Sequence, residues 1–401
     1  MGHQAPAAVH ARGGLPAQRP GQPAPSPAAT GRPSPVKIWI SGGLYASVLV
    51  VTQFIMQYVM LPRLLLESAG QEAWITVLIL GVYALVVALA VVWIACRFPD
   101  RDPLKAIRCT LGSWATYPIV LLYCAFNVLI YAMSLSDVQT FTKILLLPDT
   151  PAWVLAVMIA LFTIYTVLQG VEPIARTAYG VLVPLVLVIL VLPFGVGKEI
   201  RLLQIDPFLW KGFSGVLRGA WLALPWAGQS LIVLSLMRHL SLRVNPYKWT
   251  LIGVGSAHLA LAIMVLLISL VFGSILPSRL LYPGHELFAI VALTESIERI
   301  QAGIMVLWLC GSLINITLHL YVAVEEGSLA LGIQRRGWIT LILGAAGVFL
   351  AQWAGGALYR RSIAREAWWI GMHIAGQLAV LALLGLATLL IRMRQGAGTS
   401  A

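Results

Sequence analysis

Residues 148–176 read PDTPAWVLAVMIALFTIYTVLQGVEPIAR and decide how the rest of the chain is divided. They contain a complete apolar segment, Trp153 to Leu168, which is marked at both ends. Before it, Thr150 is well placed to cap a helix and Pro151 to occupy the first helical position. After it, Gly170 can end the helix. The clear ends of this segment therefore set where the neighbouring apolar segments begin and end.

The composition is that of an integral membrane protein. Of the 401 residues, 59% are hydrophobic and 10% are charged, whereas a soluble domain has about 25% charged residues. The net charge is +12, but the Lys and Arg residues lie in the short connections between apolar runs. This distribution indicates membrane topology and contact with lipid headgroups, and it does not favour nucleic-acid binding.

The sequence gives no support to an enzyme. The four cysteines have neither metal-type nor redox spacing. There is no nucleophile elbow, no HExxH motif, no pair of intramembrane carboxylates and no Gly-rich phosphate loop. We therefore expect no catalytic residues, no metal and no cofactor.

Ten apolar runs have about the 20-residue length that crosses a bilayer. They are Ile38–Leu61, Ala73–Cys96, Trp114–Ser136, Trp153–Leu168, Ile174–Phe194, Phe213–Met237, Trp249–Phe272, Ile300–Val324, Trp338–Trp353 and Ala367–Ile391. An even number places both termini on one side. That side holds sixteen of the 27 Lys and Arg residues, so we expect both termini to be cytoplasmic. No Asp or Glu lies deep in any run, which disfavours proton-coupled transport.

We expect three parts along the chain. Residues 1–36 contain eight Pro, eight Ala and five Gly without an apolar run, which is typical of a disordered cytoplasmic tail. The ten-helix membrane domain spans 37–394, and 395–401 form a short C-terminal tail. Between the seventh and eighth runs, a turn at Tyr282 and Pro283 leads into a short external or re-entrant helix over 287–293.

Ten spans can form two halves of five with opposite orientation, and such inverted repeats carry interrupted helices at equivalent positions. The sixth span has Pro225 and Gly228 in its interior. Both residues free backbone groups that must line a cavity or be covered by neighbouring helices. The first span has Gly42 and Gly43 but no central proline. We expect helices one and six to be interrupted.

Polar residues inside the spans are the candidates for a ligand site, because they are costly to expose to lipid. Several lie four residues apart on one helix face, or beside the predicted break. They are Gln53, Gln57, Asn127, Tyr131, Pro225, Gly228, Gln229 and Asn315. Each could instead form hydrogen bonds between packed helices. His258, His319 and His373 are most simply packing residues, and Glu172 with Arg176 an i,i+4 ion pair.

Several short motifs occur in the order and spacing of one known family. They are Leu61-Pro62-Arg63, Gly70-Gln71-Glu72-Ala73-Trp74, Arg97-Phe98-Pro99, Pro148-Asp149-Thr150-Pro151-Ala152-Trp153, Gly170-Val171-Glu172-Pro173-Ile174-Ala175-Arg176, Tyr282-Pro283, Glu298-Arg299, Trp308 and Tyr321. On these residues the chain resembles the B subunit of spore germination receptors (GerAB-like), a branch of the amino acid–polyamine–organocation transporter superfamily. The resemblance covers about residues 37 to 391.

The resemblance implies an all-α membrane protein with ten transmembrane helices in an inverted 5+5 repeat (LeuT-like). It implies a nutrient-sensing subunit in the spore inner membrane that works with an A-type membrane subunit and a C-type lipoprotein. Its ligand would be a small, amino-acid-like nutrient. The alternatives are an amino-acid or polyamine permease of the same fold, and a membrane scaffold. Members of the family often have a lysine near the position of Asn315, and the neutral amide here cannot replace a coupling cation.

Overall fold

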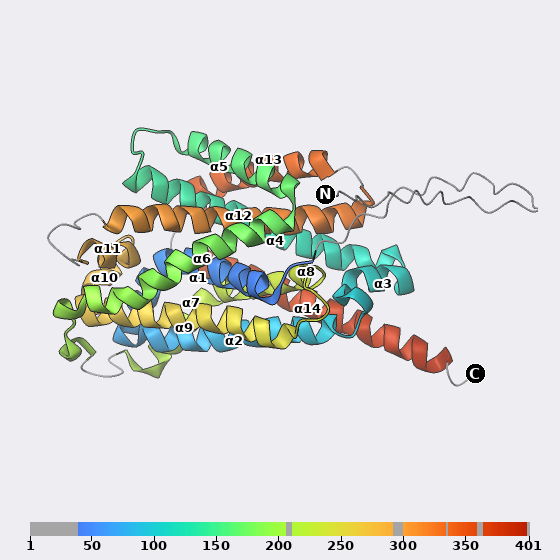
Figure 1. Cartoon of the computed structure of the whole chain (residues 1–401), viewed down its shortest axis with the longest axis horizontal. Helices are drawn as coiled ribbons and strands as arrows, with labels where there is room; N and C mark the ends of the chain where they lie inside the picture. Colours follow the sequence, from blue (N-terminus) through green and yellow to red (C-terminus); the bar gives the residue numbers. More distant parts are fainter. Residues whose placement is uncertain (1–38, 206–210, 292–299, 334–335, 359–363, 399–401) are drawn as a thin grey trace, which may run out of the picture. The chain divides into compact units, whose positions relative to one another are not determined.

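The computed structural model describes residues 39–205, 211–291, 300–333, 336–358 and 364–398, most of which are helical (Figure 1). The predicted tail 1–36 and residues 399–401 lie outside this part of the chain. The long helices are α1 (Gly42–Ala69), α2 (Ala73–Ala95), α4 (Ser113–Leu145), α5 (Ala152–Gln169), α6 (Val171–Gly195), α7 (Gly212–Ala227), α9 (Pro246–Phe272), α12 (Ile300–Leu331), α13 (Arg336–Leu358) and α14 (Ala364–Gly398). The short ones are α3 (Pro103–Leu111), α8 (Val233–Met237), α10 (Ile275–Arg279) and α11 (Pro283–Ala289).

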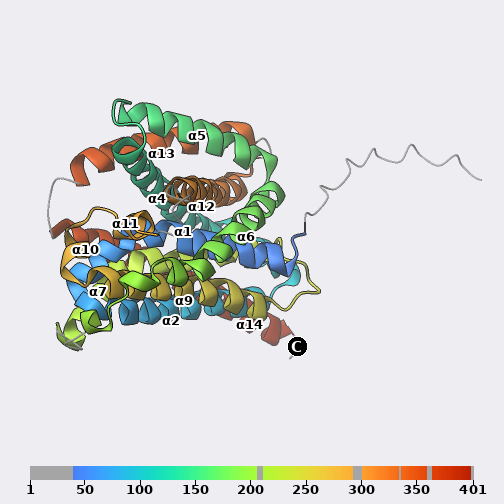
Figure 2. The ribbon, with the colours of Figure 1, turned by 60° about the vertical axis from the view of Figure 1, so that its left-hand side comes forward.

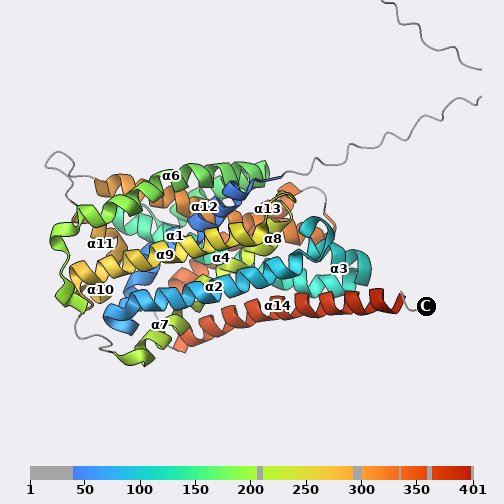
Figure 3. The ribbon, with the colours of Figure 1, turned by 60° about the horizontal axis from the view of Figure 1, so that its bottom comes forward.

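Eight stretches of the described chain are long and apolar enough to cross a membrane. One of them, Gly42–Ala95, contains both α1 and α2, which run in opposite directions on either side of a 3-10 turn at Gly70–Glu72 (Figure 3). The expected all-helical membrane fold is therefore confirmed. The count of ten spans and the inverted repeat stay predictions. Helix α14 continues to Gly398, and the division of the chain into three parts stays a prediction.

The stretch around residues 148–176 forms α5 and the start of α6. Gly170 ends α5 with a φ of 91°, a left-handed conformation that glycine adopts without a Cβ clash. The expected N-cap at Thr150 is wrong: Pro151 occupies that position and makes no side-chain capping bond. Arg176 donates to Glu172 across one turn at 2.7 Å, and both side chains are exposed, so the pair has the structural role expected of it.

The two expected helix interruptions have different outcomes. The sixth span is interrupted: α7 ends at Ala227, and the 3-10 segment η5 (Gly228–Ile232) separates it from α8. The first span is not interrupted, because α1 is one α-helix from Gly42 to Ala69. Its two glycines lie at the start rather than the middle, and its single proline, Pro62, is accommodated near the end.

The helices form two packed groups around α1 (Figure 2). One group contains α4, α5, α12 and α13, and the other contains α2, α7 and α9. Helix α1 lies between them, with contacts to α6, α7, α9 and α12. Accordingly Tyr45, Phe54 and Ile55 of α1 are almost completely buried.

We call the end of the bundle that contains α3 and the start of α1 the inner end, which is the predicted cytoplasmic side. There, Ile40 and Leu240 form an isolated parallel β-bridge. The Ile40 amide donates to the His239 carbonyl at 2.8 Å, and the Ser241 amide donates to the Ile40 carbonyl at 3.1 Å. The chain entering α1 is thus joined to the chain leaving α8.

At the opposite end, α11 lies against α1. The predicted short helix over 287–293 is wrong in its bounds, because the helix starts at the turn itself, at Pro283. A Cβ added to Gly284 would lie 2.1 Å from the Tyr58 carbonyl oxygen, so only glycine allows this contact. The ring of Phe141 packs on Trp308 at 4.1 Å and on Tyr282 at 4.9 Å, which closes this end over α1.

Candidate functional site

The middle of α1 carries two buried amides that face the break in the sixth span. Gln53 and Gln57 lie four residues apart, so they share one helix face. The Gln57 Nε2 donates to the Gln53 Oε1 at 3.4 Å and to the Trp226 carbonyl at 3.5 Å. These contacts connect α1 directly to the end of α7.

The 3-10 segment η5 follows from its sequence. Pro225 has no N–H to donate within the helix, and Gly228 is a poor helix former. Side chains cover several carbonyls near the break: Ser230 donates to the Ala227 carbonyl at 2.8 Å, and the Tyr123 hydroxyl donates to the Leu231 carbonyl at 3.1 Å. The break is therefore supported by specific hydrogen bonds, as intramembrane backbone requires.

Asn315 of α12 completes a group that we call the amide cluster, consisting of Gln53, Gln57, Gln229 and Asn315. The Asn315 Nδ2 donates to the Thr52 carbonyl at 3.0 Å and to the Gln229 Oε1 at 3.4 Å. All four side chains are buried. Three of their polar atoms have no hydrogen-bond partner among the described residues: Gln53 Nε2, Gln57 Oε1 and Asn315 Oδ1. The cluster thus presents one unpaired donor and two unpaired acceptors without any fixed charge.

Gln377 of α14 also contacts the break, and sequence reasoning did not select it. A Cβ on Gly228 would lie 1.6 Å from the Gln377 Nε2, so the glycine makes room for this amide. The Tyr83 hydroxyl donates to the Gln377 Oε1 at 2.6 Å. A polar residue in the last apolar run was a usable signal, since such residues are costly in lipid.

The remaining two sequence-selected residues lie elsewhere. Within the part of the chain that the structure describes, the side chain of Asn127 forms no hydrogen bond with the amide cluster. Its Nδ2 donates to the Tyr123 carbonyl, and its Oδ1 lies 2.9 Å from the His319 Nδ1. The Tyr131 hydroxyl lies 3.4 Å from the Thr163 hydroxyl of α5, and its ring covers Gly347 of α13. Tyr131 therefore packs between helices, away from the cluster.

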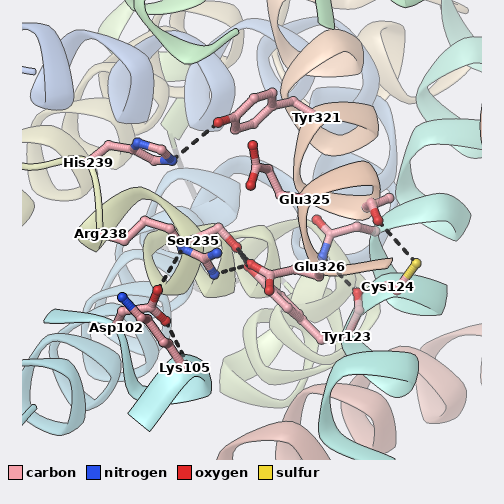
Figure 4. A network of polar contacts seen from close by, with 12 residues as sticks. Asp102, Lys105, Tyr123, Cys124, Ser235, Arg238, His239, Tyr321, Glu325 and Glu326 are labelled. Carbon is pink, nitrogen blue, oxygen red and sulfur yellow. Dashed lines mark hydrogen bonds and ion pairs between the residues drawn. The ribbon is translucent and has the colours of Figure 1, made fainter. Parts of the chain in front are cut away.

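A second polar group lies toward the inner end, and we call it the inner charge network: Asp102, Tyr123, Ser235, Arg238 and Glu326 (Figure 4). Arg238 forms an ion pair with Glu326, and its Nε lies 3.9 Å from an Asp102 oxygen. Ser235 donates to Glu326 at 2.6 Å, and its Oγ lies 3.3 Å from the Tyr123 hydroxyl. The same tyrosine reaches η5, so the network contacts the break.

The ion pair between Arg238 and Glu326 is largely buried. The side chain of Glu326 is 0% exposed and that of Arg238 is 12% exposed. Burial alone would lower the pKa of Arg238, but the carboxylates of Glu326 and Asp102 raise it above its ordinary value. Next to the network, Arg336 pairs with Glu325, and the Tyr321 hydroxyl lies 3.2 Å from the His239 Nε2.

Two helices extend beyond the predicted apolar runs and carry carboxylates just past the predicted ends. Helix α12 continues past Val324 to Leu331 and so contains Glu325 and Glu326, and α4 continues to Leu145 and contains Asp137. Hydropathy ends a span at the first charged residues. A charge that is paired, as Glu326 is, allows the helix to continue.

Comparison with known proteins gives consistent results. The family described as "Spore germination protein" matches residues 40–389. Spore germination protein XB of Bacillus anthracis is 25% identical over 288 residues, covering 69% of this chain and 77% of that protein. Putative spore germination protein YfkT of Bacillus subtilis (strain 168) is 30% identical over 266 residues, covering 66% and 72%.

Two solved transporter structures share the fold. MhsT in complex with L-phenylalanine superposes with a TM-score of 0.62 at 16% identity, covering 88% of this chain and 89% of that one. Mhp1, a nucleobase-cation-symport-1 family transporter with bromovinylhydantoin bound, has a TM-score of 0.60 at 11% identity, covering 89% and 94%. At this identity the similarity concerns the fold alone.

Proposed function

We propose, from the premise that this chain belongs to the spore germination protein family, that it is the nutrient-sensing membrane subunit of a spore germination receptor. The family match extends over nearly the whole described chain, and the fold is that of small-molecule transporters. In this proposal the protein lies in the spore inner membrane with both termini cytoplasmic. It acts together with an A-type membrane subunit and a C-type lipoprotein.

The amide cluster is the proposed ligand site, and one observation carries this assignment. Three buried polar atoms from Gln53, Gln57 and Asn315 have no hydrogen-bond partner among the described residues. Buried polar groups without partners cost about 1–3 kcal/mol each, so a ligand that satisfies them gains that energy. They lie beside the 3-10 segment, where a small backbone change can open space.

The chemistry of the cluster favours a small ligand without net charge. Amide N–H groups can donate to a carboxylate, and amide oxygens can accept from an ammonium group. The cluster itself has no charged side chain, so a net ionic ligand would be buried without a counter-charge. A zwitterionic amino acid fits both requirements. Asn127 and Tyr131, which lie outside the cluster, are not included in this proposed site.

We propose that η5 transmits ligand binding from the amide cluster to the inner charge network. A ligand that shifts this segment would act on Leu231, whose carbonyl accepts from Tyr123. Tyr123 contacts Ser235, and Ser235 contacts Glu326. Ligand binding would thereby alter the inner charge network, which lies at the end of the bundle that is cytoplasmic in this proposal.

The test is equilibrium binding of the common ¹⁴C-labelled amino acids to the purified full-length chain in detergent. We expect at least one neutral amino acid to bind, and Gln53→Leu to weaken it about tenfold or more, because the variant leaves a ligand polar group unpaired. The matched control is Gln352→Leu, which removes a half-buried amide that pairs with Gln139, outside the amide cluster. Absence of binding across the panel, or equal weakening by both variants, would contradict the assignment.

The alternative is an amino-acid or polyamine permease, and the shared fold with two transporters supports it. Uptake distinguishes the two functions. A sensing subunit binds its ligand but does not accumulate it in liposomes that contain this chain alone. Time-dependent accumulation of the bound amino acid in such liposomes would favour the permease.

A further inference from the structure

A cavity of about 440 Å³ opens at the inner end between α3 and α14. Figures 1 and 3 show these two helices side by side at this end of the bundle. The volume of the cavity is in the range of small-molecule sites, which is about 300–1,000 Å³. It lies apart from the amide cluster and shares only Asp102 with the inner charge network.

Cations from three elements line this cavity. Arg97 follows α2, Lys105 lies on α3 and Arg392 lies near the end of α14. The buried Arg97 Nε has no hydrogen-bond partner among the described residues. Two carboxylates, Asp100 and Asp102, also line the cavity, so the lining is positive by one charge.

The carboxylates are already engaged with protein groups. Asp102 accepts from the Lys105 amide at 3.1 Å and lies 3.9 Å from Arg238, and Asp100 also has an interaction within the protein. Two further arginines nearby direct their guanidinium groups to carbonyls: Arg101 to three carbonyls including that of Val244, and Arg108 to that of Leu329. The surroundings of the cavity therefore keep an excess of positive charge.

The cavity lies where membrane spans end. Arg97 lies two residues after the stretch Gly42–Ala95, and Arg392 lies in the last turn of the stretch Ile370–Met393. Helix α3, which forms one wall, buries Leu104 and Ile107 and exposes Lys105. An amphipathic helix between two spans, with a cation on its outer face, is typical of the level of the lipid headgroups.

Apolar side chains continue from this cavity along the membrane-facing surface. Trp93 is 53% exposed and lies under Arg97, whose guanidinium carbon is 3.3 Å from the ring centroid. On α14, Leu389 is 61% and Met393 is 71% exposed, next to the lining residue Arg392. A molecule with an anionic head and apolar chains fits this arrangement, because its head meets the cations while its chains follow these side chains.

We propose that this cavity binds the phosphate headgroup of an anionic phospholipid of the cytoplasmic leaflet, held by Arg97, Lys105 and Arg392. The cytoplasmic leaflet is rich in anionic lipid, and basic pockets between spans on that side bind such headgroups. The lipid connects α2, α3 and α14 at the inner end. This site is independent of the proposed ligand site.

Thermal unfolding of the purified full-length chain in detergent tests the site, with titration of phosphatidylglycerol or of phosphatidylcholine with the same acyl chains. We expect phosphatidylglycerol to raise the unfolding temperature saturably and phosphatidylcholine to leave it nearly unchanged. The double variant K105Q/R392Q should raise the half-saturating lipid concentration about tenfold or more, since each basic residue contributes to binding at the membrane surface. The control R243Q/K248Q removes two exposed cations at the same end, outside the cavity, and should leave this concentration unchanged.

A second measurement needs no variant. Cys109 lines the cavity and is exposed, whereas the exposed Cys310 lies on α12 outside it. Phosphatidylglycerol should slow modification of Cys109 by a maleimide, measured by peptide mass mapping, relative to Cys310. Equal effects of the two lipids, or no protection of Cys109, would overturn the proposal. If millimolar inorganic phosphate or glycerol phosphate reproduced the stabilisation, the ligand would be a soluble phosphate and the lipid assignment would fall.

Discussion

Gly228→Ala is the substitution that tests the break in the sixth span most directly. The added Cβ would lie 1.6 Å from the Gln377 Nε2, 2.0 Å from its Cδ and 2.2 Å from its Oε1, where ordinary contact begins at 3.4 Å. The Gln377 amide must therefore move by about 1.8 Å, the difference between the 1.6 Å separation and the 3.4 Å of ordinary contact. That movement breaks the 2.6 Å bond from the Tyr83 hydroxyl.

Two costs contribute to the expected effect. Overpacking a filled interior costs about 1–3 kcal/mol, and leaving a buried hydrogen-bond partner unsatisfied costs about 1–3 kcal/mol. We expect Gly228→Ala to lower the free energy of unfolding by about 2–6 kcal/mol, the sum of these two costs. Unfolding of the purified chain by SDS in mixed micelles measures this free energy.

A double-mutant cycle identifies the cause. In the Gln377→Ala background the space next to residue 228 is open, so adding Gly228→Ala should cost at least about 1 kcal/mol less than it does alone. Gly255→Ala in α9 is the control, because an added Cβ there meets nothing within 4 Å; it should be neutral or stabilising by up to about 1 kcal/mol. Additive effects of Gly228→Ala and Gln377→Ala would refute the reasoning.

Two further predictions concern the two ends of the bundle. Gly284→Ala places a Cβ 2.1 Å from the Tyr58 carbonyl oxygen and must displace α11, so we expect a loss of about 1–3 kcal/mol together with faster proteolysis of the segment 273–291. Gly180→Ala, where an added Cβ meets nothing within 4 Å, is its control. Glu326→Ala removes the closer ion-pair partner of Arg238 and leaves Asp102, at 3.9 Å, as the remaining one among the described residues, so it should cost about 3–5 kcal/mol in the same SDS assay. The double variant E326M/R238M should be more stable than Glu326→Ala, and a cost of Glu326→Ala under about 1 kcal/mol would show that this pair does not hold the inner end.

Features that depend on a few neighbouring residues, such as helix ends and the break in the sixth span, were predictable from the sequence. Gly170 ends α5 because of its own backbone freedom, and Pro225 with Gly228 produce the 3-10 segment because of the groups they lack. Length and apolarity were sufficient to predict membrane-crossing helices. These properties are visible within a few residues of the chain.

Contacts between distant residues could not be predicted in the same way. Gly228 was selected as a helix breaker, but its second role, admitting Gln377, depends on where α14 packs. Tyr131 shares a helix face with Asn127, yet packing directs it toward α5 and α13. The inner charge network was missed because a hydropathy limit at Val324 excluded Glu326, whose burial depends on Arg238 in another helix.

The bridge between Ile40 and Leu240 gives the chain a mechanical connection. Tension on the polypeptide ahead of Ile40 is carried by two backbone hydrogen bonds to the segment that directly follows Arg238. A displacement of Ile40 therefore acts directly on the backbone at His239 and Ser241. Force applied there loads the end of the sixth span without requiring any contact with the membrane interior.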